Sequence, residues 1–400
     1  MIPKHPFTQE DKRFDAGKWL MIAAFFVLSC IMFYQMTLRP SSDINIHTLW
    51  AAEATFADPI SFVRHVAHPL WHLLVVGLMT AGVPVKLASA LITALAKAVE
   101  MWLVHRLFTA ALQHKYSRNA ITLFAAVCGS VACIWLPFYN PTVYYGVGTP
   151  NTWHSCTQML VLPFMILGVP LTAWCYDSFE QLLPVQGDQT RLPWKQPITL
   201  GIVLFIGLLA KPTFLQAFLP AACLFFLVQW IRHPKNSRYF VQIILCVLPA
   251  VFLMLLQYLY YFGNIISTST SMEIQLSWEK LRYTVVQVLM LNAFPIYTLW
   301  ATRKQKWDTC FVLTLLLNVA AILEMIILGE GGRRSQDGNF AWGLMGAAMM
   351  LWIVCLIRFL KEARLKKPEL RHIPGWLLLA WHQFTGIYYF IYLLFSGTAF

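Results

Sequence analysis

The chain has 400 residues, of which 58% are hydrophobic and only 12% are charged. Soluble proteins carry about 25% charged residues, so this composition excludes a soluble globular protein. The net charge of +12 comes from short basic clusters between long apolar runs, a pattern typical of membrane topology rather than of a nucleic-acid-binding surface. We therefore expect an all-α protein, a polytopic transmembrane helical bundle.

The apolar runs predict about eleven spans, since a spanning helix needs roughly 20 apolar residues. The first run, 19–38, follows a basic tail and is predicted to be an uncleaved signal anchor with a cytoplasmic N-terminus. The other ten are expected at 86–108, 119–138, 156–176, 198–211, 213–231, 239–262, 284–302, 308–328, 340–360 and 375–396.

The first exterior loop, 39–85, contains a further apolar segment at 69–83. This segment is too short to span and is predicted to be an interfacial or re-entrant helix. With eleven spans, 21 of the 30 lysines and arginines fall on the cytoplasmic side, as the positive-inside rule requires. A twelfth span at 69–83 would place every later basic loop outside, so the eleven-span arrangement is favoured.

Asp43 lies just after the first span, and His47 follows one helical turn later. A carboxylate at the outer membrane surface could accept a proton from an acceptor hydroxyl or bind a divalent cation. Alternatively, Asp43 is a solvated residue at the membrane interface or a helix N-cap, because Ser41-Ser42-Asp43 is typical of an N-cap. Glu53 and Asp58 follow in the same loop.

His65, His68 and His72 have the spacing of one helical face, which Pro69 interrupts. Imidazoles bind zinc well, but an HExxH pattern is absent and interfacial histidines commonly serve as anchors or hydrogen-bonding residues. We therefore predict no metal ligands among them, and Pro69 is expected to begin the next helix.

The second exterior loop, 139–155, is rich in glycine, proline, asparagine and aromatic residues. Tyr145, Asn151 and His154 are candidate substrate-binding residues, because aromatic faces with polar edges suit a sugar. The aromatic side chains could equally form a belt at the membrane interface.

Lys211 interrupts an apolar stretch between two spans, where a charge is costly and usually functional. It could bind a lipid-linked phosphate or extend its ammonium to the outer headgroups. Arg333 and Arg334 lie in an exterior loop, against the positive-inside trend, and guanidinium groups match phosphate oxygens. Glu330 and Asp337 could instead pair with these arginines.

Four motifs in order resemble the GT-C superfamily of membrane glycosyltransferases, which use polyprenyl-phosphate-linked sugars. An acidic residue, Asp43, follows the first span, and the long first exterior loop carries His68-Pro69-Leu70-Trp71. The second span ends in Val104-His105-Arg106-Leu107, and a short hairpin reads Gly207-Leu208-Leu209-Ala210-Lys211-Pro212. The resemblance covers residues 1–235, the family-like transmembrane module, whereas 236–400 is expected to be a variable C-terminal module.

The resemblance implies transfer of a sugar from a polyprenyl-phosphate donor to a lipid or glycan acceptor outside a bacterial cytoplasmic (inner) membrane. It assigns the general-base role to Asp43 and donor-phosphate binding to Lys211, Arg333 and Arg334. Many members have a second carboxylate near the first span, a position that Glu53 or Asp58 would take here. The resemblance requires no cofactor, although the exterior carboxylates could hold Mg²⁺ or Mn²⁺.

Two other classes remain open. A lipid-linked polysaccharide polymerase or ligase would use the same exterior arginines. A lipid-linked sugar flippase or transporter would need ionisable residues within the spans, for which Lys97 and Glu100 are the best candidates. Because these two lie three residues apart in one helix, a structural ion pair is the favoured interpretation.

Overall fold

The computed structural model describes residues 15–136, 138, 148–262, 271–332, 339–363 and 369–396. It confirms the all-α class, since helices dominate the described residues and the sheet has two short strands. Nine helices in these ranges are long and apolar enough to cross a membrane. They are α1 (Ala16–Met36), α4 (Val85–Leu112), α6 (Cys156–Gln186), α8 (Thr213–Arg232), α9 (Ser237–Phe262), α10 (Trp278–Ala301), α11 (Thr309–Ile327), α12 (Ala341–Glu362) and α13 (Ile373–Ser396).

Two of the eleven expected spans are shorter helices. The segment expected at 198–211 forms α7 (Lys195–Ala210), which has 16 residues. The segment expected at 119–138 is helical only in α5 (Arg118–Cys128), and the chain continues without helix through 131–136. The apolar segment predicted to be too short to span is α3 (Leu70–Thr80), and Pro69 directly precedes it as expected.

The non-helical segment after α5 is buried among the helices. Val131 is fully buried and Ala132 nearly so. The Ala132 amide donates to the His382 carbonyl of α13 at 3.2 Å, and the Ile134 amide donates to the Met290 carbonyl of α10 at 2.9 Å. Irregular backbone at membrane depth is tolerated only where protein or water satisfies its polar groups, and these two helices supply the acceptors.

Helix α10 is kinked at Asn292, whose backbone is non-helical. Pro295 lacks an amide hydrogen, so the Leu291 carbonyl has no helical donor four residues later. The indole of Trp352 on α12 donates to this carbonyl at 3.2 Å. The kink is therefore stabilised by a neighbouring helix.

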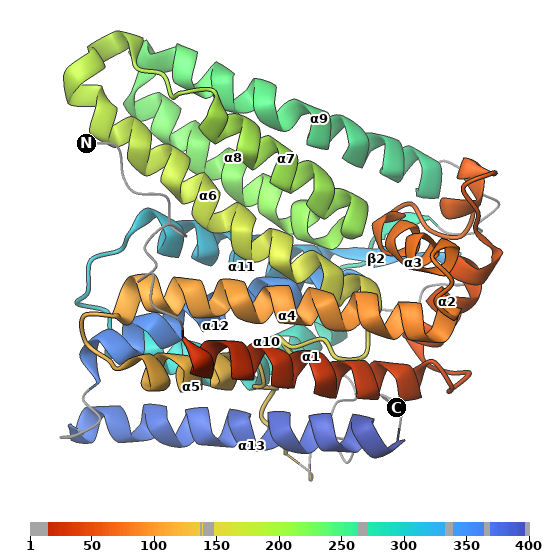
Figure 1. Cartoon of the computed structure of the whole chain (residues 1–400). Coiled ribbons are helices and arrows are strands. Elements are labelled where there is room, and N and C mark those ends of the chain that lie inside the picture. Colours follow the sequence, from red (N-terminus) through yellow and green to blue (C-terminus); the bar gives the residue numbers. More distant parts are fainter. Residues whose placement is uncertain are drawn as a thin grey trace.

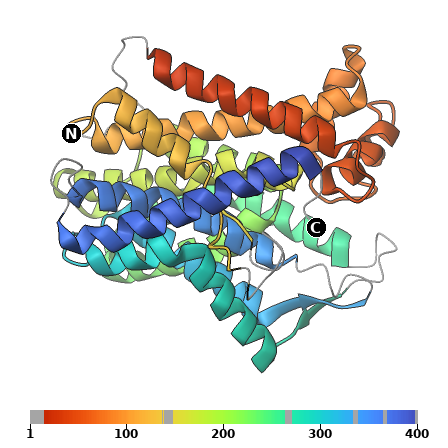
Figure 2. The ribbon, with the colours of Figure 1, turned by 90° about the horizontal axis from the view of Figure 1, so that it is seen from below.

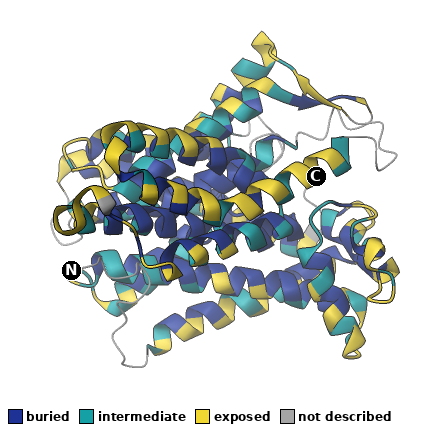
Figure 3. Ribbon diagram, turned by 90° about the horizontal axis from the view of Figure 1, so that it is seen from above, coloured by how far each residue is buried: buried dark blue, intermediate teal, exposed yellow. Residues whose placement is uncertain are grey.

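Helices α6 and α12 are buried along most of their length, whereas α1, α9 and α13 are exposed along most of theirs. Figure 3 shows the buried residues gathered in the interior of the bundle and the exposed ones on its outer surfaces. Figure 1 shows α7, α8 and α9 on one side and α1, α4, α5 and α13 on the other. Helices of the predicted modules 1–235 and 236–400 pack on each other. Helix α9 packs on α7, and α11 packs on α8. The two sequence modules are thus interleaved in space.

The elements of the first exterior loop gather at one end of the bundle. There α2 (Asp43–Glu53), a short turn (Pro59–Phe62) and α3 lie beyond the ends of the long helices (Figures 1 and 2). Strands β1 (Met272–Ile274) and β2 (Leu328–Glu330) pair antiparallel at this same end. The predicted topology places this end outside the membrane.

The ion pair expected within α4 is confirmed. The Lys97 ammonium lies 2.8 Å from a Glu100 carboxylate oxygen, and both side chains are fully buried. Lys97 also lies over the Trp153 ring, 4.4 Å from its centroid. Each charge is therefore compensated inside the bundle.

Candidate functional site

Two adjacent residues at the start of α2, Ser42 and Asp43, have different roles. Ser42 is the N-cap, and its hydroxyl accepts from the Asn45 amide at 3.2 Å and donates to the Met36 carbonyl. Asp43 is the first helical residue, so the prediction that Asp43 caps the helix is wrong. Among the residues that the structure describes, its buried Oδ2 atom has no hydrogen-bond partner. The Asp43 carboxylate is therefore not used as the helix cap.

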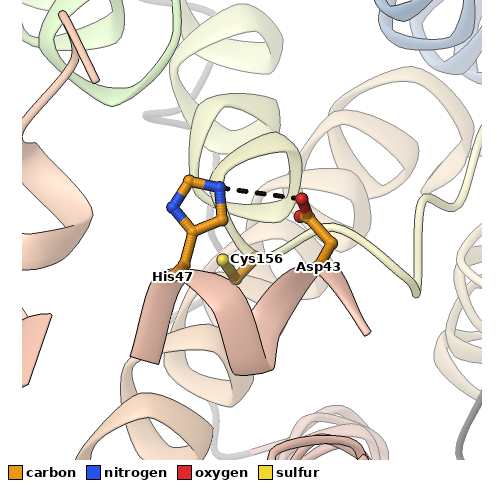
Figure 4. A group of neighbouring side chains, drawn as sticks. All are labelled: Asp43, His47 and Cys156. Atoms are coloured by element: carbon orange, nitrogen blue, oxygen red, sulfur yellow. Dashed lines mark ion pairs between the residues drawn. The ribbon is translucent and has the colours of Figure 1, made fainter. Parts of the chain in front are cut away.

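His47 projects from the same face of α2, one turn after Asp43 (Figure 4). Its Nε2 atom lies 3.7 Å from Asp43 Oδ1, and its Nδ1 atom lies 3.1 Å from Nε2 of His72 on α3. The ring also packs edge-on against Trp50 and Trp71. Contacts from α2 and α3 thus fix the orientation of this imidazole.

Cys156 completes a group with Asp43 and His47. It is the first residue of α6 and is fully buried. One ligand atom from each of the three residues lies within 4.8 Å of the other two (Figure 4). The Asp43 side chain is 39% exposed, so the group is accessible from one side.

Lys211 and His154 meet at the ring of Trp342, close to the start of α12. Lys211 ends α7 in an extended conformation, and its ammonium lies 4.2 Å from the Trp342 centroid. The His154 ring lies 5.0 Å from the same indole, and its Nδ1 atom lies 3.3 Å from the Tyr389 hydroxyl. An ammonium over an indole face is a stabilising cation–π arrangement.

Burial and neighbouring charges shift the pKa values of two imidazoles at this end of the bundle. Burial lowers the pKa of His154 to about 4, an effect that nearby Asp43 opposes and Lys211 reinforces. Burial also lowers the pKa of His72 to about 3, reinforced by His47 and His65 and opposed by Asp43. Both rings are therefore neutral at physiological pH, and His154 is within electrostatic range of Asp43 and Lys211 together.

The other carboxylates of the first exterior loop have their own partners. Glu53 is exposed at the end of α2 and lies 3.3 Å from His65. Asp58 accepts from the Ile60 amide and pairs with Arg64 at 3.0 Å. Neither belongs to the group around Asp43, so the expectation that one of them acts as its second carboxylate stays a prediction.

The three histidines at 65, 68 and 72 are not gathered at one point. His65 stacks on Trp50 and is exposed, whereas His72 is buried against His47. His68 is half-buried just before Pro69. The histidine in contact with Asp43 is therefore His47, which in turn is hydrogen-bonded to His72.

Asn151 is fully buried and uses its amide inside the protein. Its Oδ1 atom accepts from Lys97 at 2.7 Å, and its Nδ2 atom donates to the carbonyls of Val131 and Cys128. These bonds link the second exterior loop to α4 and to the non-helical segment. Tyr145, Arg333 and Arg334 lie outside the described residues.

Three residues at this end were not predicted as parts of a site: His72, Cys156 and Trp342. Cys156 lies in an apolar run and belongs to no motif, which is typical of an inert packing residue. Its position at the boundary between an exterior loop and a span was the available signal. Comparison with protein-family models finds no match for the chain, and comparison with curated proteins finds none either.

Proposed function

We propose that this protein is a membrane glycosyltransferase that moves a sugar from a polyprenyl-phosphate donor to a lipid or glycan acceptor. The observation that supports this best is the convergence of Asp43 and Lys211. Asp43 lies beside Cys156 at the start of α6, and Lys211 shares the Trp342 ring with His154, two residues before Cys156. A base and a cation at one end of the bundle are the two groups that sugar transfer from a phosphate requires.

In the proposed reaction, Asp43 removes the proton from the acceptor hydroxyl as its oxygen attacks the anomeric carbon of the sugar. The bond between that carbon and the phosphate oxygen breaks, and its electron pair stays on the leaving phosphate. The Lys211 ammonium stabilises the charge that develops there. The proton ends on Asp43 and leaves to solvent through its exposed side.

The placement of Lys211 supports the phosphate-binding role. The turn that carries it connects α7 and α8, and the Trp342 ring holds its ammonium. A cation beside a low-dielectric lipid boundary attracts a phosphate more strongly than one in open water. Lys97 and Glu100, the residues that a transporter would use, pair with each other in the interior, and this favours transfer over transport.

The test is a mass-spectrometric search for lipids that co-purify with the full chain in mild detergent. We expect a polyprenyl phosphate or its glycosylated form with the wild type, and a marked loss in Lys211→Gln. Lys86→Gln is the matched control, because Lys86 is an exposed lysine in the first turn of α4, at the predicted exterior end of that helix. Equal lipid retention in Lys211→Gln and Lys86→Gln would contradict the assignment of Lys211.

A further inference from the structure

The group formed by Asp43, His47 and Cys156 has the composition of a zinc site. It offers a carboxylate oxygen, an imidazole nitrogen and a thiol sulfur, and the three ligand atoms lie within 4.8 Å of one another. Thiolate and imidazole favour Zn²⁺ over Mg²⁺ and Mn²⁺, which prefer oxygen ligands. We propose that these three residues bind one zinc-class divalent cation at the exterior end of the bundle.

The spacing suits tetrahedral coordination after small movements of the side chains. Ligand distances of about 2.0–2.3 Å around a tetrahedral zinc place neighbouring ligand atoms about 3.3–3.6 Å apart. His47 Nε2 and Asp43 Oδ1 are already 3.7 Å apart. The two residues sit one helical turn apart on α2, so both project toward the Cys156 end of α6 (Figure 4).

His72 supplies the supporting contact that metal-binding imidazoles usually have. With His47 Nε2 on the cation, the His47 Nδ1–H group donates to His72 Nε2 across 3.1 Å. Such a partner fixes the tautomer and orientation of the ligand. His72 is itself nearly fully buried on α3, so it holds this position firmly.

Charge and access also fit a cation. The Asp43 carboxylate and a Cys156 thiolate together balance the two charges of the cation where water is scarce. His47 and Cys156 are buried, whereas Asp43 is partly exposed and offers an entry path. Three protein ligands leave a fourth position open, as in zinc sites that accept a water or a substrate oxygen.

Binding of the cation would change the basicity of Asp43. A carboxylate bound to Zn²⁺ is a weaker base than a free one, because the cation withdraws its electron density. If Asp43 is the general base, zinc loading therefore lowers transfer activity and removal of zinc restores it. Binding itself requires no transferase activity and is measured independently.

The experiment uses the full chain in detergent without a histidine tag, stripped with a chelator and then titrated with Zn²⁺ and Co²⁺. We expect one tightly bound cation per chain by elemental analysis and, for Co²⁺, a thiolate-to-metal charge-transfer band. Cys156→Ser abolishes this band. His72→Phe, which removes only the supporting contact, weakens the affinity by about 10–100-fold.

Two matched variants guard against adventitious binding. Cys223→Ser removes an exposed cysteine on α8, and His65→Gln removes an exposed histidine of the same loop; both are expected to bind like the wild type. The proposal is overturned if the wild type binds no more metal than Cys156→Ser, or if the band is lost in Cys223→Ser. Thermal unfolding of each variant without metal shows that lost binding is not lost folding.

Discussion

At the residue scale, the group around Asp43 is built from side chains of three helices, α2, α3 and α6. Asp43 and His47 were predicted to share a face because they lie one turn apart, and the structure places them so. Cys156 and His72 join them only through tertiary packing of α6 and α3 on α2. Local spacing carries no information about contacts between residues so far apart in the chain.

The start of α2 shows how a tertiary contact selects the N-cap residue. Ser42 and Asp43 are both good N-cap residues, so composition alone does not decide between them. The structure decides because the Ser42 hydroxyl also reaches the Met36 carbonyl at the end of α1. This extra hydrogen bond joins the start of α2 to the end of α1, and the Asp43 carboxylate is not used as the cap.

The buried histidines predict how stability depends on pH. The pKa of His154 is lowered to about 4 in the folded state, against about 6.5 in an unfolded chain. Between these values the unfolded chain binds a proton that the folded chain does not, so stability is complete above about pH 6.5 and falls as the pH drops toward 4. His72 acts in the same direction, since its folded pKa is about 3.

Thermal unfolding in detergent between pH 7 and 4.5 checks this expectation. The melting temperature of the wild type should fall over this range. His154→Gln should fall less steeply, because the neutral amide has no proton to bind. An equally steep fall in His154→Gln would show that other groups dominate the acid sensitivity.

At the element scale, hydropathy located the membrane-embedded segments but did not give their conformation. Residues 119–138 are apolar throughout most of their length and therefore indicated one spanning helix. The structure ends that helix at Cys128, because the following amides bond to carbonyls of α10 and α13. A helix and a buried extended segment can have the same apolar composition, and only the acceptors on other helices distinguish them.

Close packing of α13 on this non-helical segment predicts a sharp difference between two glycines. A Cβ atom at Gly386 would lie 1.8 Å from the Ser130 carbonyl oxygen, whereas one at Gly77 on α3 would meet no described residue within 4 Å. Gly386→Ala should therefore separate the two segments and lower the melting temperature strongly. Gly77→Ala should be neutral or stabilising by up to about 1 kcal/mol, since alanine is favoured within helices.

Melting temperatures and the yield of monodisperse protein measure both effects. If the two alanine variants were equally stable, α13 would not contact the segment at Ser130 as described.

At the scale of the whole molecule, the distribution of basic residues was the most informative feature of the sequence. It placed 69–83 outside the set of spans, in agreement with the short α3. It also assigned one end of the bundle to the exterior, the end where α2, α3 and the strands gather (Figure 1). The mutual packing of 1–235 and 236–400 could not be predicted, because hydropathy does not specify helix neighbours.

This topology makes a prediction about accessibility. The turn at Pro234–Asn236 lies between α8 and α9, whereas the segment at 275–277 lies between α9 and α10. Epitope tags inserted at 275–277 should be labelled on intact cells, and tags in the turn should be labelled only after permeabilisation. The reverse pattern would place Asp43 and Lys211 in the cytoplasm.

The most direct test of the catalytic role of Asp43 is sugar transfer by Asp43→Asn, measured with a purified polyprenyl-phosphate sugar as donor. Asparagine keeps the size of the side chain but removes its basicity, and general-base catalysis supplies about 10²–10⁴-fold in rate. We predict a rate at least about 100-fold below that of the wild type, with unchanged folding, while the exposed carboxylate controls Glu273→Gln and Glu279→Gln stay close to wild type. Transfer by Asp43→Asn at the wild-type rate, or an equal loss in the two controls, would contradict the assignment of Asp43 as the base.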